Sequence, residues 1–108
     1  MPKRKLPIRK VSVGHVTYDL EFVKDLKNWR GVDLMGNCDH RNLRLELDED
    51  LHPRHVGNTL LHEILHAIWG VYRLPVKDEE RYVETLATTL VSLFRQNPRL
   101  YEVITRNE

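Results

Sequence analysis

Two histidines four residues apart, with a glutamate beside the first, are the residues whose types and spacing suggest chemistry in this sequence. They form the pattern His62-Glu63-Ile64-Leu65-His66. Residues four apart lie one above the other on a helix, so both imidazoles can reach one metal ion. The adjacent glutamate then lies close to a water bound to that metal. The pattern predicts a metal site with His62 and His66 as ligands and Glu63 as the catalytic base.

A third protein ligand is expected, because a catalytic zinc site usually takes three and leaves one position open. No histidine or cysteine follows His66, so a ligand on the C-terminal side must be a carboxylate. Among the acidic residues that open the next predicted helix, Glu80 falls on the apolar stripe that should face the motif helix, so we predict it as the ligand. Glu79 and Glu84 flank this stripe and remain alternatives. Glu84 could instead accept a hydrogen bond from a ligand imidazole. Two imidazoles and a carboxylate with an open position favour Zn2+.

Two helices must position these side chains. Apolar residues recur at intervals of three and four over about 54–70, and Pro53 suits the first turn of this motif helix. Asp78 is a plausible N-cap for a second helix over about 78–96, which Asn97-Pro98 ends. The connection over 72–77 is short, so the two helices should be neighbours. The tail from Arg99 could add a short turn of helix.

A small sheet is expected before the helices. Alternating apolar and polar residues predict strands over about 8–13, 16–23, 32–36 and 42–47, with the turn-forming residues Gly36 to His40 between the last two. The fold class is then α+β, with an antiparallel or mixed sheet packed on the two helices. Residues 1–10 read as a flexible basic arm, and residues 11–108 as one domain. Trp29, Trp69 and Cys38 are expected in or near the core.

Composition excludes several classes of function. The 108 residues suffice for one domain, and no apolar run is long enough for a membrane span or a signal peptide. A single cysteine excludes an internal disulfide and suits the reducing cytoplasm. The net charge of +1 argues against a dedicated nucleic-acid surface. Basic residues of the arm would give at most non-specific, salt-sensitive binding; these are Lys3, Arg4, Lys5, Arg9 and Lys10.

The stretch Asn58-Thr-Leu-Leu-His-Glu-Ile-Leu-His-Ala-Ile, followed by a short connection and Glu79-Glu80, resembles the small zincin-like metallopeptidases whose third ligand is a glutamate. Compact proteins of this gluzincin type occur in phage and prophage genomes, near the ImmA/IrrE and SprT-like groups. The resemblance covers about residues 33–97. Aligning the Phe-Ala pair of ImmA/IrrE proteins with Leu86-Ala87 also places the glutamate ligand at Glu80. The resemblance implies a zinc cofactor and a peptide or protein substrate.

The expected reaction is zinc-dependent peptide-bond hydrolysis, in which Glu63 takes a proton from a zinc-bound water and passes it to the leaving amine. In zincins an edge strand beside the motif helix binds extended substrate, and residues 43–48 are the candidate here. A second group usually stabilises the oxyanion. The sequence does not choose among Tyr72, Tyr82, His40 and His55.

The competing interpretation is a zinc-stabilised interaction module without catalytic activity. Small domains gain stability from bound metals, and a metal between two helices would hold them together. Such a structural site has no use for Glu63 beside the first histidine, so the sequence favours catalysis.

Overall fold

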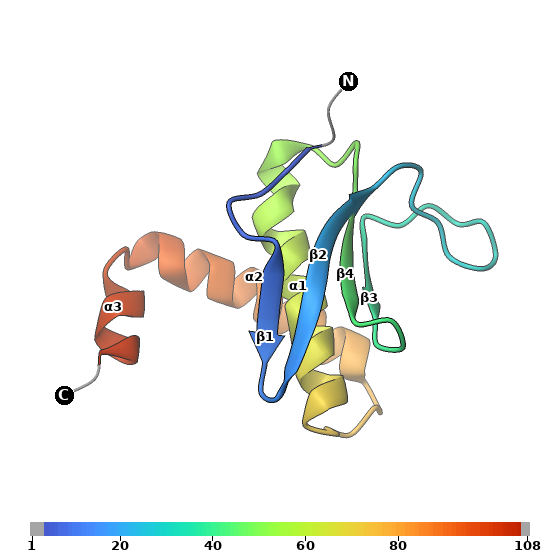
Figure 1. Ribbon diagram of the computed structural model, residues 1–108. Helices are drawn as coiled ribbons and strands as arrows, with labels where there is room; N and C mark the ends of the chain where they lie inside the picture. Colours follow the sequence, from blue (N-terminus) through green and yellow to red (C-terminus); the bar gives the residue numbers. More distant parts are fainter. Residues whose placement is uncertain (1–3, 107–108) are drawn as a thin grey trace.

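A sheet covered on one face by a long helix organises the chain (Figure 1). The computed structural model describes residues 4–106. Its strands are β1 (Lys10–Val13), β2 (Val16–Val23), β3 (Gly36–Asp39) and β4 (Arg44–Asp48), and its helices are α1 (Pro53–Val71), α2 (Glu79–Gln96) and α3 (Leu100–Thr105). The predicted α+β class is confirmed, and both predicted helices begin and end within a residue or so of their expected bounds.

The sheet is mixed, with the strand order β1-β2-β4-β3. Strands β1 and β2 are antiparallel, β2 and β4 are parallel, and β3 and β4 are antiparallel. Strand β4 is therefore interior, and the side chains of Leu45 and Leu47 are fully buried. The expectation that residues 43–48 form an edge strand beside the motif helix is wrong. The edge strand on that side is β3, because the alternating pattern of a strand does not reveal its place in the sheet.

Strand β3 also differs from the sequence prediction in position. The predicted strand over 32–36 is wrong, since the strand spans the residues Gly36 to Asp39 that we interpreted as a turn. Val32 and Met35, which suggested the earlier strand, are exposed in the preceding loop. A Cβ atom at Gly36 would lie 2.8 Å from Cγ2 of Thr59 and 3.0 Å from Oε2 of Glu63. The close approach of β3 to α1 therefore requires a glycine at position 36. In the sequence, this glycine cannot be distinguished from a glycine in a turn.

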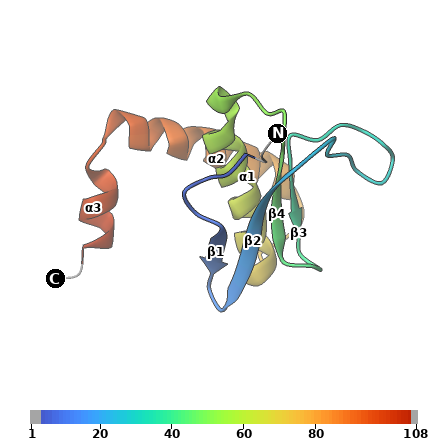
Figure 2. The ribbon, with the colours of Figure 1, turned by 45° about the horizontal axis from the view of Figure 1, so that its top comes forward.

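Two apolar clusters hold the elements together. Tyr18 and Leu45 from the sheet pack with Ala67 of α1. Leu65 of α1 packs with Val83 and Ala87 of α2. Figure 2 shows α2 continuing beyond the sheet to α3, and no residue of α3 is buried. The expected short helix in the tail is confirmed as α3, but the core is built by the sheet, α1 and the first half of α2.

The helix starts differ in how they are capped. His52 precedes α1, and its Nδ1 atom accepts a hydrogen bond from the backbone N–H of Arg54. Asp78 occupies the N-cap position of α2 in a left-handed conformation (φ 61°), and its side chain makes no capping hydrogen bond. The expected N-cap position of Asp78 is therefore confirmed, although no side-chain hydrogen bond accompanies it.

Other expectations concern the exposed segments. Trp29 is 86% exposed at the tip of the loop between β2 and β3, so its predicted place in the core is wrong. Residues 1–3 of the predicted arm lie outside the described residues. The backbone N–H of Arg4 donates to Oε1 of Glu49 at 2.9 Å, and its guanidinium lies over the ring of Phe22. Among residues 4–106, no helix has both the length and the apolar character needed to cross a membrane.

Candidate metal centre

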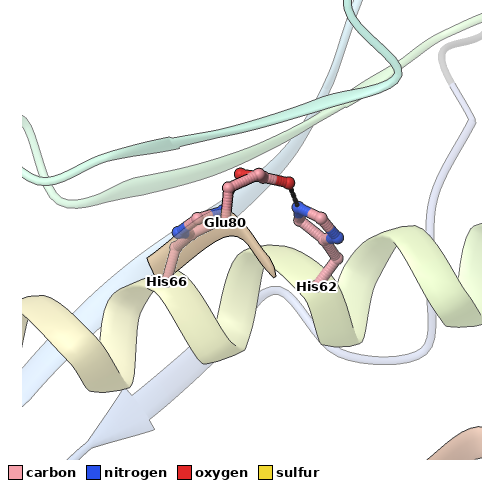
Figure 3. Close-up of side chains that lie close together, drawn as sticks. All are labelled: His62, His66 and Glu80. Carbon is pink, nitrogen blue, oxygen red and sulfur yellow. Dashed lines mark hydrogen bonds and ion pairs between the residues drawn. The ribbon is translucent and has the colours of Figure 1, made fainter. Parts of the chain in front are cut away.

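The three predicted ligands meet where the start of α2 crosses the middle of α1 (Figure 3). His62 and His66 are one turn apart on α1, and their side chains are 22% and 16% exposed. Nε2 of His62 lies 2.8 Å from Oε1 of Glu80, and Nε2 of His66 lies 2.9 Å from Oε2 of the same carboxylate. Val83 and Ala87 are fully buried against α1 and anchor the helix that carries Glu80.

This donor set fits a divalent metal ion. One ligand atom from each of the three side chains lies within 4.8 Å of the other two. Around zinc, with bonds of roughly 2.0–2.2 Å, neighbouring ligand atoms are separated by about 3.4 Å, so modest side-chain rotations suffice. Glu80 is more exposed than the imidazoles and can make this adjustment. The group could therefore hold one metal ion through two imidazole nitrogens and one carboxylate.

Glu79 orients one of these imidazoles. Its Oε2 atom lies 2.5 Å from Nδ1 of His66. A carboxylate only accepts hydrogen bonds, so Nδ1 is the donor to Glu79, and Nε2, which faces Glu80, is the nitrogen placed to bind a metal. The sequence offers Glu84 as another candidate for such a role. It lies one turn further along α2, lines the cleft described below, and makes no hydrogen bond or ion pair with the part of the chain that is described.

Replacing Glu79 is expected to weaken metal binding without abolishing it. Glu79→Gln removes the charged acceptor that orients His66, and loss of such an outer partner typically lowers affinity by about 10–100-fold. Competition with a chromophoric chelator measures the change. Glu84→Gln removes the same charge one turn away and should bind metal like the wild type. Equal affinities for Glu79→Gln and the wild type would show that the carboxylate does not support the site.

Glu63 is buried beside the metal ligands, with 7% of its surface exposed. Burial raises the pKa of its carboxyl group to about 7; the nearby Glu80 also raises this pKa, and His66 opposes the rise. Its carboxylate makes no hydrogen bond with any residue from 4 to 106, and it lines the same cleft as the ligands. A carboxylate with this pKa and an unused acceptor can take up a proton near neutral pH.

The stability of the metal-free protein should therefore depend on Glu63. Its folded-state pKa lies above the usual 4.5, so the fold binds more protons than the unfolded chain between about pH 4.5 and 7. The free energy of unfolding should fall as the pH rises through this window, by up to about 3 kcal/mol. Urea unfolding in the presence of a chelator, at pH 5 to 8, measures this change. Glu63→Gln should lack this component and be the more stable protein at pH 8; parallel curves for the two proteins would contradict the assignment.

A cleft of about 750 Å³ surrounds these residues. One wall is β3 with the end of the preceding loop, and the other is formed by α1 and the start of α2. This volume is in the usual range for ligand sites, roughly 300–1,000 Å³. Because β3 is an edge strand, its outer backbone groups can pair with an extended chain lying in the cleft.

Two of the four candidate oxyanion donors lie in this cleft. His40 and His55 line it, whereas Tyr72 and Tyr82 do not. The Tyr72 hydroxyl approaches Gly14 in the β1–β2 turn, and the Tyr82 ring stacks on Trp69 with centroids 6.3 Å apart. The two tyrosines therefore have packing roles away from the metal ligands.

Comparisons with known proteins found no relative of this chain. No protein-family model matches the chain, and no curated protein or solved structure matches it either. The interpretation of the site therefore depends on its own geometry and chemistry.

Proposed function

We propose that this chain is a zinc-dependent peptidase, a minimal zincin of the type with a glutamate as third ligand. The observation that supports this most is the combination of two imidazoles and the Glu80 carboxylate with a buried, unpaired Glu63 in one open cleft. A metal site with only a structural role would not need a carboxylate at that position, since burial disfavours the ionised form of Glu63. The resemblance of the motif to the compact zincins of phage genomes agrees with this proposal. The single cysteine agrees with a reducing cytoplasm.

The residues of the cleft have separate roles in the proposed peptide hydrolysis. A zinc ion, when bound by His62, His66 and Glu80, supplies a Lewis acid that polarises the scissile carbonyl and acidifies water. Glu63 takes the proton from the attacking water and delivers it to the leaving amine. The free edge of β3 aligns an extended peptide through backbone hydrogen bonds, so recognition depends little on side chains at that edge.

Cleavage of a complex peptide mixture tests this function. The zinc-loaded protein is incubated with peptides from a digested proteome, and new termini are identified by mass spectrometry. We expect new termini with the wild type, their loss when a chelator is added, and their return when zinc is restored. Glu102→Gln, a charge change in α3 away from the cleft, should behave like the wild type. A zinc-loaded wild type that yields no new termini would contradict the proposal and favour a zinc-stabilised interaction module.

A further inference from the structure

His40 lies in the same cleft and is held there by three contacts. Its Nδ1 atom is 3.4 Å from the Tyr18 hydroxyl and 3.7 Å from Sγ of Cys38. A Cβ atom at Gly70 would lie only 2.6 Å from Cε1 of the imidazole, so the ring packs on the bare backbone of α1. Gly70 follows His66 by one turn, which places His40 along the helix face that carries both imidazole ligands.

The second ring nitrogen of His40, Nε2, is free in the described part of the chain and can serve as a hydrogen-bond donor. A neutral imidazole carries one proton, on either Nδ1 or Nε2. Burial raises the pKa of Cys38 to about 12, and burial also raises the pKa of Tyr18, so the thiol and the hydroxyl both keep their protons. Both groups can then donate to Nδ1, and hydrogen bonds in this direction place the imidazole proton on Nε2. Nε2 has no hydrogen-bond partner among residues 4–106.

His55 is less suited to a fixed role. It lies in the first turn of α1, seven residues before the nearer imidazole ligand His62, whereas Gly70 follows His66 by four. Its ring lies edge-on to the ring of His52, with centroids 6.0 Å apart, and no hydrogen bond to its side chain is found within residues 4–106. Donors that stabilise a developing charge act best when they are already oriented, because no reorganisation is then needed during the reaction. Both imidazoles are exposed, but among the described contacts only His40 has ones that orient its ring, those with Tyr18, Cys38 and Gly70.

We propose that His40 stabilises the oxyanion of the tetrahedral intermediate, by donating a hydrogen bond from Nε2 in the peptidase function proposed above. As the water oxygen bonds to the scissile carbon, the carbonyl π electrons move onto the carbonyl oxygen, and the water proton goes to Glu63. His40 donates a hydrogen bond to that oxygen and transfers no proton. Tyr18 and Cys38 are positioning residues that act through His40, and Gly70 provides the space for its ring.

The tautomer can be measured without activity or metal. Nitrogen-15 NMR of the metal-free protein, at a pH where the imidazole carries a single proton, should show that proton of His40 on Nε2. Tyr18→Phe removes one of the two donors to Nδ1 and should increase the share of the other tautomer. A wild-type His40 with its proton on Nδ1 would overturn the proposal, whether or not the chain cleaves peptides.

Two probes separate oxyanion binding from metal binding. Acetohydroxamate binds the zinc alone, whereas a phosphinic Ala-Ala pseudopeptide places a charged oxygen at the oxyanion position. We expect His40→Ala to keep its zinc and its acetohydroxamate affinity while it loses about 10²–10³-fold in phosphinate affinity and in kcat/KM. Equal losses for both probes, or none, would overturn the role of His40. If the wild type binds acetohydroxamate but not the phosphinate, the oxyanion site is absent although the metal site stands.

Two glycines on α1 provide a matched pair of variants. Gly70→Ala should shift His40 and lower phosphinate affinity at least tenfold, because the new methyl group meets the ring. Gly57→Ala introduces the same methyl group on the same helix, where nothing lies within 4 Å, and should leave phosphinate affinity unchanged. Both proteins should keep one zinc per chain. Equal phosphinate affinities for the two variants would contradict the positioning of His40 by Gly70.

Discussion

Glu63→Gln is expected to lower kcat/KM for peptide hydrolysis by about 10²–10⁴-fold while zinc remains bound. Glutamine has the size and shape of glutamate, but its amide cannot accept a proton from the attacking water. Glu63 makes no hydrogen bond to His62, His66 or Glu80, so the substitution leaves the ligands in place. The measurement is the rate of cleavage of a peptide identified from the proteome mixture, together with the zinc content of each protein.

Glu63→Gln is expected to fold like the wild type, because the substitution removes a buried charge. The variant should be at least as stable as the wild type at pH 8 in the metal-free state, since burial disfavours the ionised form of Glu63. Loss of activity with retained zinc and retained stability assigns the proton transfer to Glu63. A variant that cleaves the same peptide at the wild-type rate would refute the catalytic role of Glu63.

Among substitutions of the acidic residues of α2, Glu80→Gln is expected to cause the largest loss of metal affinity. The loss should exceed the roughly 10–100-fold expected when a residue that only orients a ligand is replaced. The carboxylate faces the Nε2 atoms of both histidines, so the substitution removes a ligand and the negative charge that attracts the cation. An uncharged amide replaces it. Titration against a chromophoric chelator gives the affinity, and circular dichroism confirms that the fold persists.

Matched variants on the same helix identify the ligand among the acidic residues of α2. Glu84→Gln changes the charge equally but should bind zinc as the wild type does, and Glu79→Gln should lie between the two. If Glu79→Gln lost zinc completely while Glu80→Gln kept it, the third ligand would be Glu79. The imidazole of His66 would then bind through Nδ1, which contacts Glu79.

The helices and the three ligand candidates could be predicted because both depend on local periodicity. Val83 and Ala87 define the buried stripe of α2, and Glu79 and Glu80, four and three residues before Val83, both lie on the side of the helix that faces α1. The structure accordingly brings Glu80 to His62 and His66. The partner of the His66 Nδ1 atom was not predictable. Glu79 reaches it from the first turn of α2 and is the less exposed of the two glutamates, with a side chain 22% exposed against 66% for Glu80, and the spacing does not assign separate roles to the pair.

The position of β3, which forms one wall of the cleft, could not be predicted for a different reason. Gly36 lies in a strand that packs within van der Waals distance of Glu63, so the absence of a side chain serves a tertiary contact. The sequence offers no means to distinguish this glycine from one in a turn. The prediction for Trp29 was wrong in the opposite sense. A large aromatic residue is usually buried, but Trp29 lies exposed at a loop tip beside Arg30. Local patterns thus locate helices well, whereas long-range packing decides where short strands and loops lie.

The central claim is that His62, His66 and Glu80 together bind one zinc ion. Elemental analysis of the protein purified without added metal tests it most directly, followed by zinc titration of the chelator-treated protein. We predict about one zinc per chain in the wild type and in Glu63→Gln, and its loss in Glu80→Gln. A wild-type protein that contains no metal and takes up none when zinc is supplied would contradict the account.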